Sequence, residues 1–111
     1  MRTYCERFSK IVIPAIRAIA AEYLIKKYHL TQVKVAELLG TTQASISYYL
    51  RHKRGKKCIE LLREQNQILS IITEIAELAY KRNPEEKLAL KICDICKIIR
   101  SDGSLKEKVF A

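Results

Sequence analysis

Small polar side chains follow Gly40, in a segment whose apolar residues recur at helical spacing. The exposed face of a surface helix usually carries pairs of Lys and Glu, whereas this segment offers short groups that can hydrogen-bond the edges of DNA bases. The amide of Gln43 can pair bidentately with N6 and N7 of adenine, and the methyl groups of Thr42 and Ala44 can pack on the thymine methyl. The residues that we predict to contact bases are Thr42, Gln43, Ala44, Ser45, Ser47 and Tyr48.

Two kinds of contact are open to the other members of this set. The hydroxyl groups of Ser45 and Ser47 can bond either base edges or phosphate oxygens. Tyr48 can face DNA or the protein core, and we favour a contact with a base or a phosphate.

Basic residues are concentrated in the same part of the chain. Residues 1–57 contain twelve Lys or Arg and three Glu, whereas residues 58–111 contain nine basic and nine acidic residues, so the net charge of +9 lies in the first half. This distribution predicts a polyanionic partner. A membrane surface would also attract it, but the sequence has no long apolar span. The basic residues that we expect to contact phosphates are Arg51, Lys53, Arg54, Lys56 and Lys57.

Two short helices joined by a tight turn are predicted to position these side chains. Thr31 can cap the first helix, and Thr41 or Thr42 can cap the second. Gly40 can adopt the left-handed conformation that the turn requires, and Ala36 is small where the two helices must cross closely. The apolar residues that we expect to anchor both helices are Val35, Leu38, Leu39, Ile46, Tyr49 and Leu50.

Residues 30–51 resemble the helix-turn-helix of lambda-type (XRE) regulators, and the run that begins at Gly40 is most similar to the turn and recognition helix of lambdoid phage repressors. The resemblance extends over roughly residues 13–56. It implies a lambda-repressor-like bundle whose third helix enters the major groove, with Gln32 donating to a phosphate. Thr41 departs from the family, which usually has an apolar residue at that position.

The rest of the sequence predicts an all-α protein, because Gly and Pro are scarce and no alternating Val/Thr-rich run occurs. One helix is expected to begin near Pro14, a long one to begin at Cys58, and another to follow the break at Asn83. Because no apolar signal segment follows Met1, we expect a cytoplasmic protein. The predicted divisions are an arm (1–12), a helix-turn-helix DNA-binding domain (13–57), a helical dimerisation region (58–103) and a frayed tail (104–111).

The dimerisation hypothesis depends on an apolar stripe in the second half. Ile68, Ile72, Ile75 and Ala79 follow the spacing of a coiled-coil seam. Neighbouring apolar residues widen this stripe beyond what a monomer of this length would easily cover, so we favour a homodimer over an intramolecular core. A two-fold dimer would bind two half-sites about one DNA turn apart.

The four cysteines have several interpretations. Cys93 and Cys96 form a CxxC inside a predicted helix, and helical cysteines at this spacing can ligate one metal ion. Zinc sites normally add a second pair or histidines, which favours buried structural cysteines. The layout of Cys5, Cys93 and Cys96 nevertheless resembles a group of small archaeal XRE-type regulators, which implies an iron–sulfur cluster or zinc. Those proteins often have a further Cys near Ser104; here Cys58 would have to replace it. A disulfide is a third interpretation.

From its sequence, the chain is predicted to be a DNA-binding transcription regulator. A redox- or metal-responsive version of that regulator is one alternative, and an antitoxin-like protein-interaction module is another. An enzyme is not expected, because the sequence has no Gly-rich phosphate loop, no paired catalytic carboxylates and no nucleophile with a neighbouring base.

Overall fold

Helices make up all the regular structure in the part of the chain that the computed structural model describes, residues 4–51 and 56–110. The prediction of an all-α protein is therefore confirmed. In chain order the elements are α1 (Tyr4–Arg7), a π-helical turn (Phe8–Val12), α2 (Ile13–Tyr28), α3 (Gln32–Leu39), α4 (Gln43–Arg51), α5 (Lys56–Glu64), α6 (Asn66–Tyr80), α7 (Glu85–Ser101) and α8 (Gly103–Phe110).

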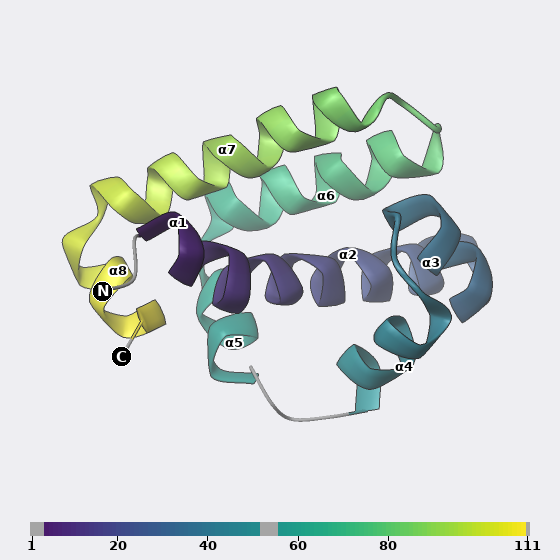
Figure 1. The fold of residues 1–111 in the computed structure, drawn as a ribbon, viewed down its shortest axis with the longest axis horizontal. Helices are drawn as coiled ribbons and strands as arrows, with labels where there is room; N and C mark the ends of the chain where they lie inside the picture. Colours follow the sequence, from purple (N-terminus) through teal and green to yellow (C-terminus); the bar gives the residue numbers. More distant parts are fainter. Residues whose placement is uncertain (1–3, 52–55, 111) are drawn as a thin grey trace.

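Helix α2 runs through the middle of the molecule (Figure 1). Helices α3, α4, α5 and α6 all pack against it, and α7 pairs with α6 on the outer side. A helix surrounded on several sides must be apolar around most of its circumference, and the small Ala side chains of α2 allow close approach of its neighbours. The residues of α2 that are buried are Ala15, Ile16, Ala18, Ile19, Ala20, Ala21 and Leu24.

The N-terminal segment is helical from Tyr4, so the prediction of an arm at residues 1–12 is wrong for the residues described. Phe8 and Val12 are buried and join the core. The helix continues past Pro14 through a widened turn, in which the N–H of Ile13 donates to the carbonyl of Phe8, five residues earlier. Because proline lacks an N–H and its ring collides with a carbonyl in a regular helix, a π-helical turn lets the chain remain helical there.

The segment that begins at Cys58 was predicted as one long helix, but it consists of two. The backbone is extended at Gln65, with φ −93° and ψ 100°, and this residue separates α5 from α6. The break allows both helices to pack on α2, where Leu62 and Ile68 on either side of it are completely buried. The predicted domain boundary between residues 57 and 58 falls inside α5, and the core is continuous across it.

The predicted dimer seam lies inside this single chain. Ile68, Ile72, Ile75 and Ala79 are each no more than 4% exposed, because α6 packs between α2 and α7. The assignment of these four side chains to an interface between two copies is therefore wrong. Their spacing is the same for a coiled-coil seam and for a buried helix face, so the sequence pattern alone did not distinguish the two.

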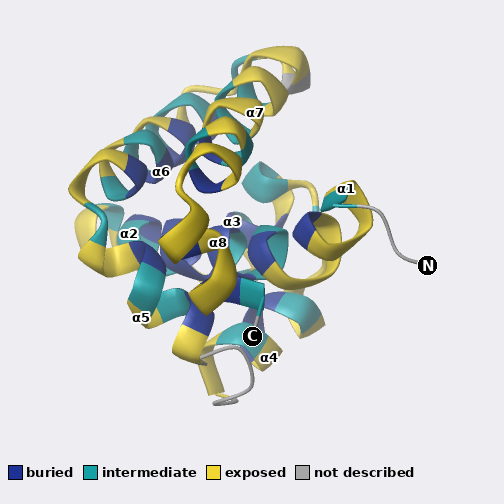
Figure 2. Cartoon of the chain, turned by 90° about the vertical axis from the view of Figure 1, so that its left-hand side faces the viewer, coloured by how far each residue is buried: buried dark blue, intermediate teal, exposed yellow. Residues whose placement is uncertain are grey.

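The C-terminal residues also differ from the prediction of a frayed tail. They form α8, whose Leu105 and Val109 are buried. The carboxylate of Asp102 accepts a hydrogen bond from the backbone N–H of Leu105 at 3.1 Å, which caps the helix. Figure 2 shows α8 and the outer face of α7 largely exposed, with burial confined to the faces turned inward. Among the described helices, none is both long and apolar enough to cross a membrane.

Candidate nucleic-acid interface

Helices α3 and α4 form the local unit that carries most of the predicted DNA contacts. Thr31 caps α3, since its hydroxyl oxygen accepts a bond from the N–H of Lys34 at 3.2 Å. Gly40 adopts the left-handed conformation, with φ 68°. Thr42 caps α4 by accepting a bond from the N–H of Ser45 at 3.1 Å. The predicted caps and the predicted turn glycine are confirmed.

The orientation of α4 is set by its apolar side. Ile46 is fully buried, and both α2 and α3 pack against this helix. Thr42, Gln43 and Ala44 are exposed because they lie at the N-terminal end of α4, one turn before the buried Ile46. This exposed first turn is the end of the helix at which a base-reading side chain must project.

A hydrogen bond joins the exposed sides of α3 and α4. Nε2 of Gln43 donates to Oε1 of Gln32 at 2.9 Å. The bond fixes the Gln43 amide relative to α3, which lowers the entropy cost of presenting it to a ligand. Of the residues predicted to touch DNA, these two are brought into direct contact.

Ser47 is placed differently from its prediction as a base-contacting residue. It is 8% exposed, and its hydroxyl oxygen accepts a 2.6 Å bond from the guanidinium of Arg51, one turn later. Because its side chain is buried and its hydroxyl is bonded within α4, Ser47 is removed from the set of base-contacting residues.

Tyr48 lies at the edge of an apolar groove. Its side chain is 40% exposed, and its ring packs edge-on against that of Tyr49 at 6.3 Å between centroids. The groove has a volume of about 490 Å³ and runs between α4, the first turns of α2, and Ile59 of α5. Tyr48 is thus neither buried in the core nor fully exposed. Its contact with a base or a phosphate remains a prediction.

The basic residues predicted to contact phosphates are only partly within the described structure. Arg51 ends α4 and Lys57 lies in the first turn of α5, and both are exposed. Lys56 begins α5, while Lys53 and Arg54 lie outside the described residues. The placed members of this set therefore stand at the two helix ends that flank residues 52–55.

The half-buried carboxylate of Glu77 on α6 holds the end of α2 that leads into α3. Sequence analysis did not predict this contact. Glu77 of α6 accepts 2.6 Å bonds from Lys27 and Tyr23 on one oxygen and from Tyr28 on the other. The ammonium of Lys27 and the two hydroxyls hold the pKa of Glu77 at about 2, below its ordinary value of 4.5. No local sequence signal identifies this cluster, because its partners lie about fifty residues away from Glu77 and only the packing of α2 on α6 brings them together.

The cysteines do not form one group in the structure. Cys58 is buried in the core, and desolvation raises the pKa of its thiol to about 11. Cys5 and Cys93 are exposed and Cys96 is half-buried. Within residues 4–51 and 56–110, no three His, Cys, Asp or Glu side chains are close enough together to hold a metal ion. The use of Cys58 as a fourth ligand is therefore not supported.

Comparison of the chain with protein-family models, with curated proteins and with solved structures gave no match. Any function assigned to the chain must therefore come from the chemistry and placement of its own residues.

Proposed function

We propose that this chain is a sequence-specific transcription regulator that binds double-stranded DNA with α4 in the major groove. The observation that carries the proposal is the hydrogen bond between Gln43 and Gln32 on the exposed side of α3 and α4. A hydrogen-bonded polar pair at the start of an exposed helix, with no charged partner among the described residues, suits hydrogen bonding to base edges.

The chemistry of the pair is compatible with simultaneous contacts to a base and to the backbone. An amide nitrogen has two hydrogens, and one hydrogen of Gln43 Nε2 is directed to Gln32. The second N–H and the carbonyl oxygen of Gln43 are then left to pair with N7 and N6 of adenine. Gln32 keeps its own amide nitrogen for a phosphate oxygen, which would set the position of α4 on the duplex.

Further contacts would come from residues on either side of this pair. Thr42, Ala44 and Ser45 accompany Gln43 in the first turn of α4, and their methyl and hydroxyl groups can contact thymine methyls and base edges. Arg51 and Lys57 are exposed cations at the following helix ends, and in this proposal they contact phosphates together with Lys53, Arg54 and Lys56. Such contacts strengthen binding without reading sequence.

We also propose that the regulator acts as a homodimer on two half-sites. One recognition helix touches only a few base pairs, and two-fold pairing doubles the sequence that is read. Since the apolar face of α6 is internal, the pairing surface must lie elsewhere on the chain. Light scattering of the full chain measures the oligomeric state, and a symmetrical sequence selected from random DNA would support the dimer.

The proposal is tested by selecting bound sequences from random double-stranded DNA and then measuring Gln43→Ala on the selected site. We expect the substitution to weaken binding to that site by about 1–3 kcal/mol and to leave binding to random DNA nearly unchanged. Gln67→Ala is the matched control, because Gln67 is an exposed glutamine on α6. Equal losses on the selected and random DNA would show that Gln43 reads no base, and the assignment of α4 would fall.

A further inference from the structure

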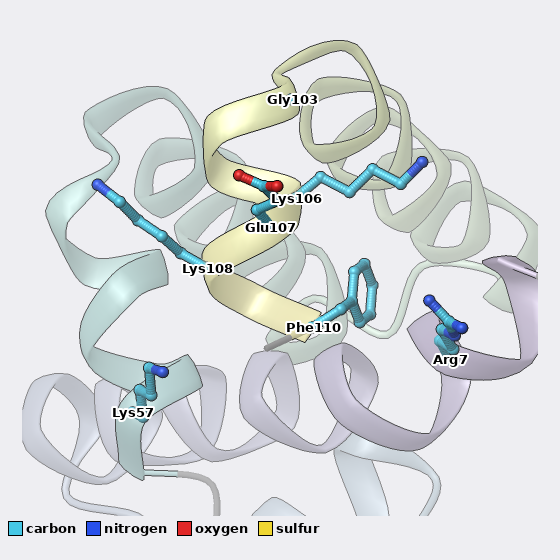
Figure 3. Close-up of a pocket in the computed structure, with 7 residues that line it drawn as sticks. All are labelled: Arg7, Lys57, Gly103, Lys106, Glu107, Lys108 and Phe110. Carbon is cyan, nitrogen blue, oxygen red and sulfur yellow. The ribbon is translucent and has the colours of Figure 1, made fainter.

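Helix α8 forms one wall of a basic cleft that the sequence did not predict. The cleft has a volume of about 1030 Å³ and lies between α8, α5 and α1. Figure 3 shows Lys57 and Lys108 on one side of it and Arg7 near the ring of Phe110 on the other. The residues that line it are Arg7, Lys57, Gly103, Lys106, Glu107, Lys108 and Phe110.

The charges of the cleft are unbalanced. Four cations from three helices line the cleft together with one carboxylate, that of Glu107. Among the described residues, none of the four cations forms an ion pair, whereas Lys26, Lys27, Lys34 and Lys91 all do. Cations on different walls of one cleft add their positive potentials, which attract an anion with several charges. The cleft is therefore suited to a ligand with several negative charges.

The wall that carries two of these cations is firmly attached to the rest of the protein. Leu105 and Val109 are buried, and the ring of Phe110 packs edge-on against Tyr4 at 5.5 Å between centroids. The ammonium of Lys106 lies 5.4 Å from the centre of the Tyr4 ring. Because α8 is held in place by these contacts, its cations keep their positions relative to Lys57 without the cost of ordering a free tail.

The position of Lys57 connects the cleft with the proposed DNA-binding helix. Lys57 comes six residues after Arg51, the last residue of α4. A chain segment of that length spans at most about 21 Å, and duplex DNA rises about 3.4 Å per base pair, so this distance corresponds to about six base pairs. Lys57 therefore lies within about 21 Å of the C-terminal end of α4, a distance shorter than one turn of duplex.

We propose that the cleft binds the phosphodiester backbone of the same DNA duplex, so that α8 forms a second backbone clamp beside the recognition helix. This inference rests on the proposed function. It assigns a role to Lys106 and Lys108, which are cations of the C-terminal half, where the sequence shows no net charge. Phosphate contacts made there add affinity and fix the orientation of the duplex but read no bases.

The test compares the salt dependence of DNA binding by the full chain and by the double variant Lys106→Gln with Lys108→Gln. Each phosphate contact contributes about 0.9 to the slope of log K against log salt concentration, so losing both reduces the slope by up to about 1.8. We expect this change on the selected site and on random DNA alike. The matched control is Lys81→Gln with Lys87→Gln. These exposed lysines lie in the turn after α6 and in the first turn of α7, at the other end of the molecule from α8 (Figure 1). This control should keep the wild-type slope.

A second variant changes binding in the opposite direction. Glu107→Gln removes the one carboxylate among the described residues that line the cleft, so we expect it to tighten DNA binding and to leave sequence preference unchanged. Circular dichroism of each variant verifies the fold.

Several results would overturn the proposal. An unchanged slope in the Lys106/Lys108 variant, beside a Gln43→Ala variant that loses site preference, would refute the clamp while leaving the proposed function intact. A wild-type chain that does not bind DNA would refute both. Binding of inorganic tripolyphosphate that is lost in the cleft variant, with DNA binding unaffected, would assign the cleft to a small phosphorylated ligand instead.

Discussion

The burial of Ile72 leads to a prediction about stability that separates a core residue from an interface residue. Its side chain is 1% exposed, on the face of α6 between α2 and α7. Ile72→Ala removes three carbons, which at about 0.8 kcal/mol for each buried methylene gives about 2.4 kcal/mol. The cavity left between three packed helices adds to this loss, so we expect a total of about 2–5 kcal/mol.

The measurement is urea unfolding followed by circular dichroism at two widely separated protein concentrations. If Ile72 belongs to the core of one chain, the loss of stability is the same at both concentrations. If it belonged to a seam between two copies, the loss of stability caused by Ile72→Ala would differ between the two concentrations, because dissociation of the seam would be coupled to unfolding. Leu90→Ala is the control, because Leu90 on α7 is 67% exposed and its truncation should change stability by less than about 0.5 kcal/mol. A concentration-dependent effect, or an effect as small as that of the control, would refute the placement of Ile72.

Two more predictions concern the contacts that position α2 and α8. The low pKa of Glu77 means that its stabilising contribution is present above the ordinary pKa of 4.5 and is lost as the pH falls towards about 2. The free energies of unfolding of the wild type and Glu77→Gln should therefore converge over that range. A constant difference down to pH 2 would contradict the role of its bonds to Lys27, Tyr23 and Tyr28. Asp102→Ala removes the cap of α8 and should cost about 0.5–2 kcal/mol, with faster amide hydrogen exchange at Leu105; unchanged exchange there would show that α8 does not depend on this cap.

Local sequence signals were sufficient wherever a structure depends on neighbouring residues. The caps at Thr31 and Thr42 and the left-handed Gly40 were predicted because each involves residues within one helical turn. The exposure of Gln43 did not follow from the burial of Ile46, because residues three apart lie on the same side of a helix; Gln43 is exposed as the first residue of α4.

Features that depend on distant segments were decided only by the tertiary structure. The apolar spacing of α6 requires a partner for its buried face but does not specify whether the partner is the same chain or a second copy; here α2 and α7 cover it. Burial of Leu105 and Val109 likewise stabilises α8, a short charged segment that has little intrinsic tendency to form a helix. The cleft exists because that helix brings Lys106 and Lys108 to Lys57, about fifty residues earlier in the chain. Residue type determined what each side chain could bond, and the packing of distant helices determined which of them meet.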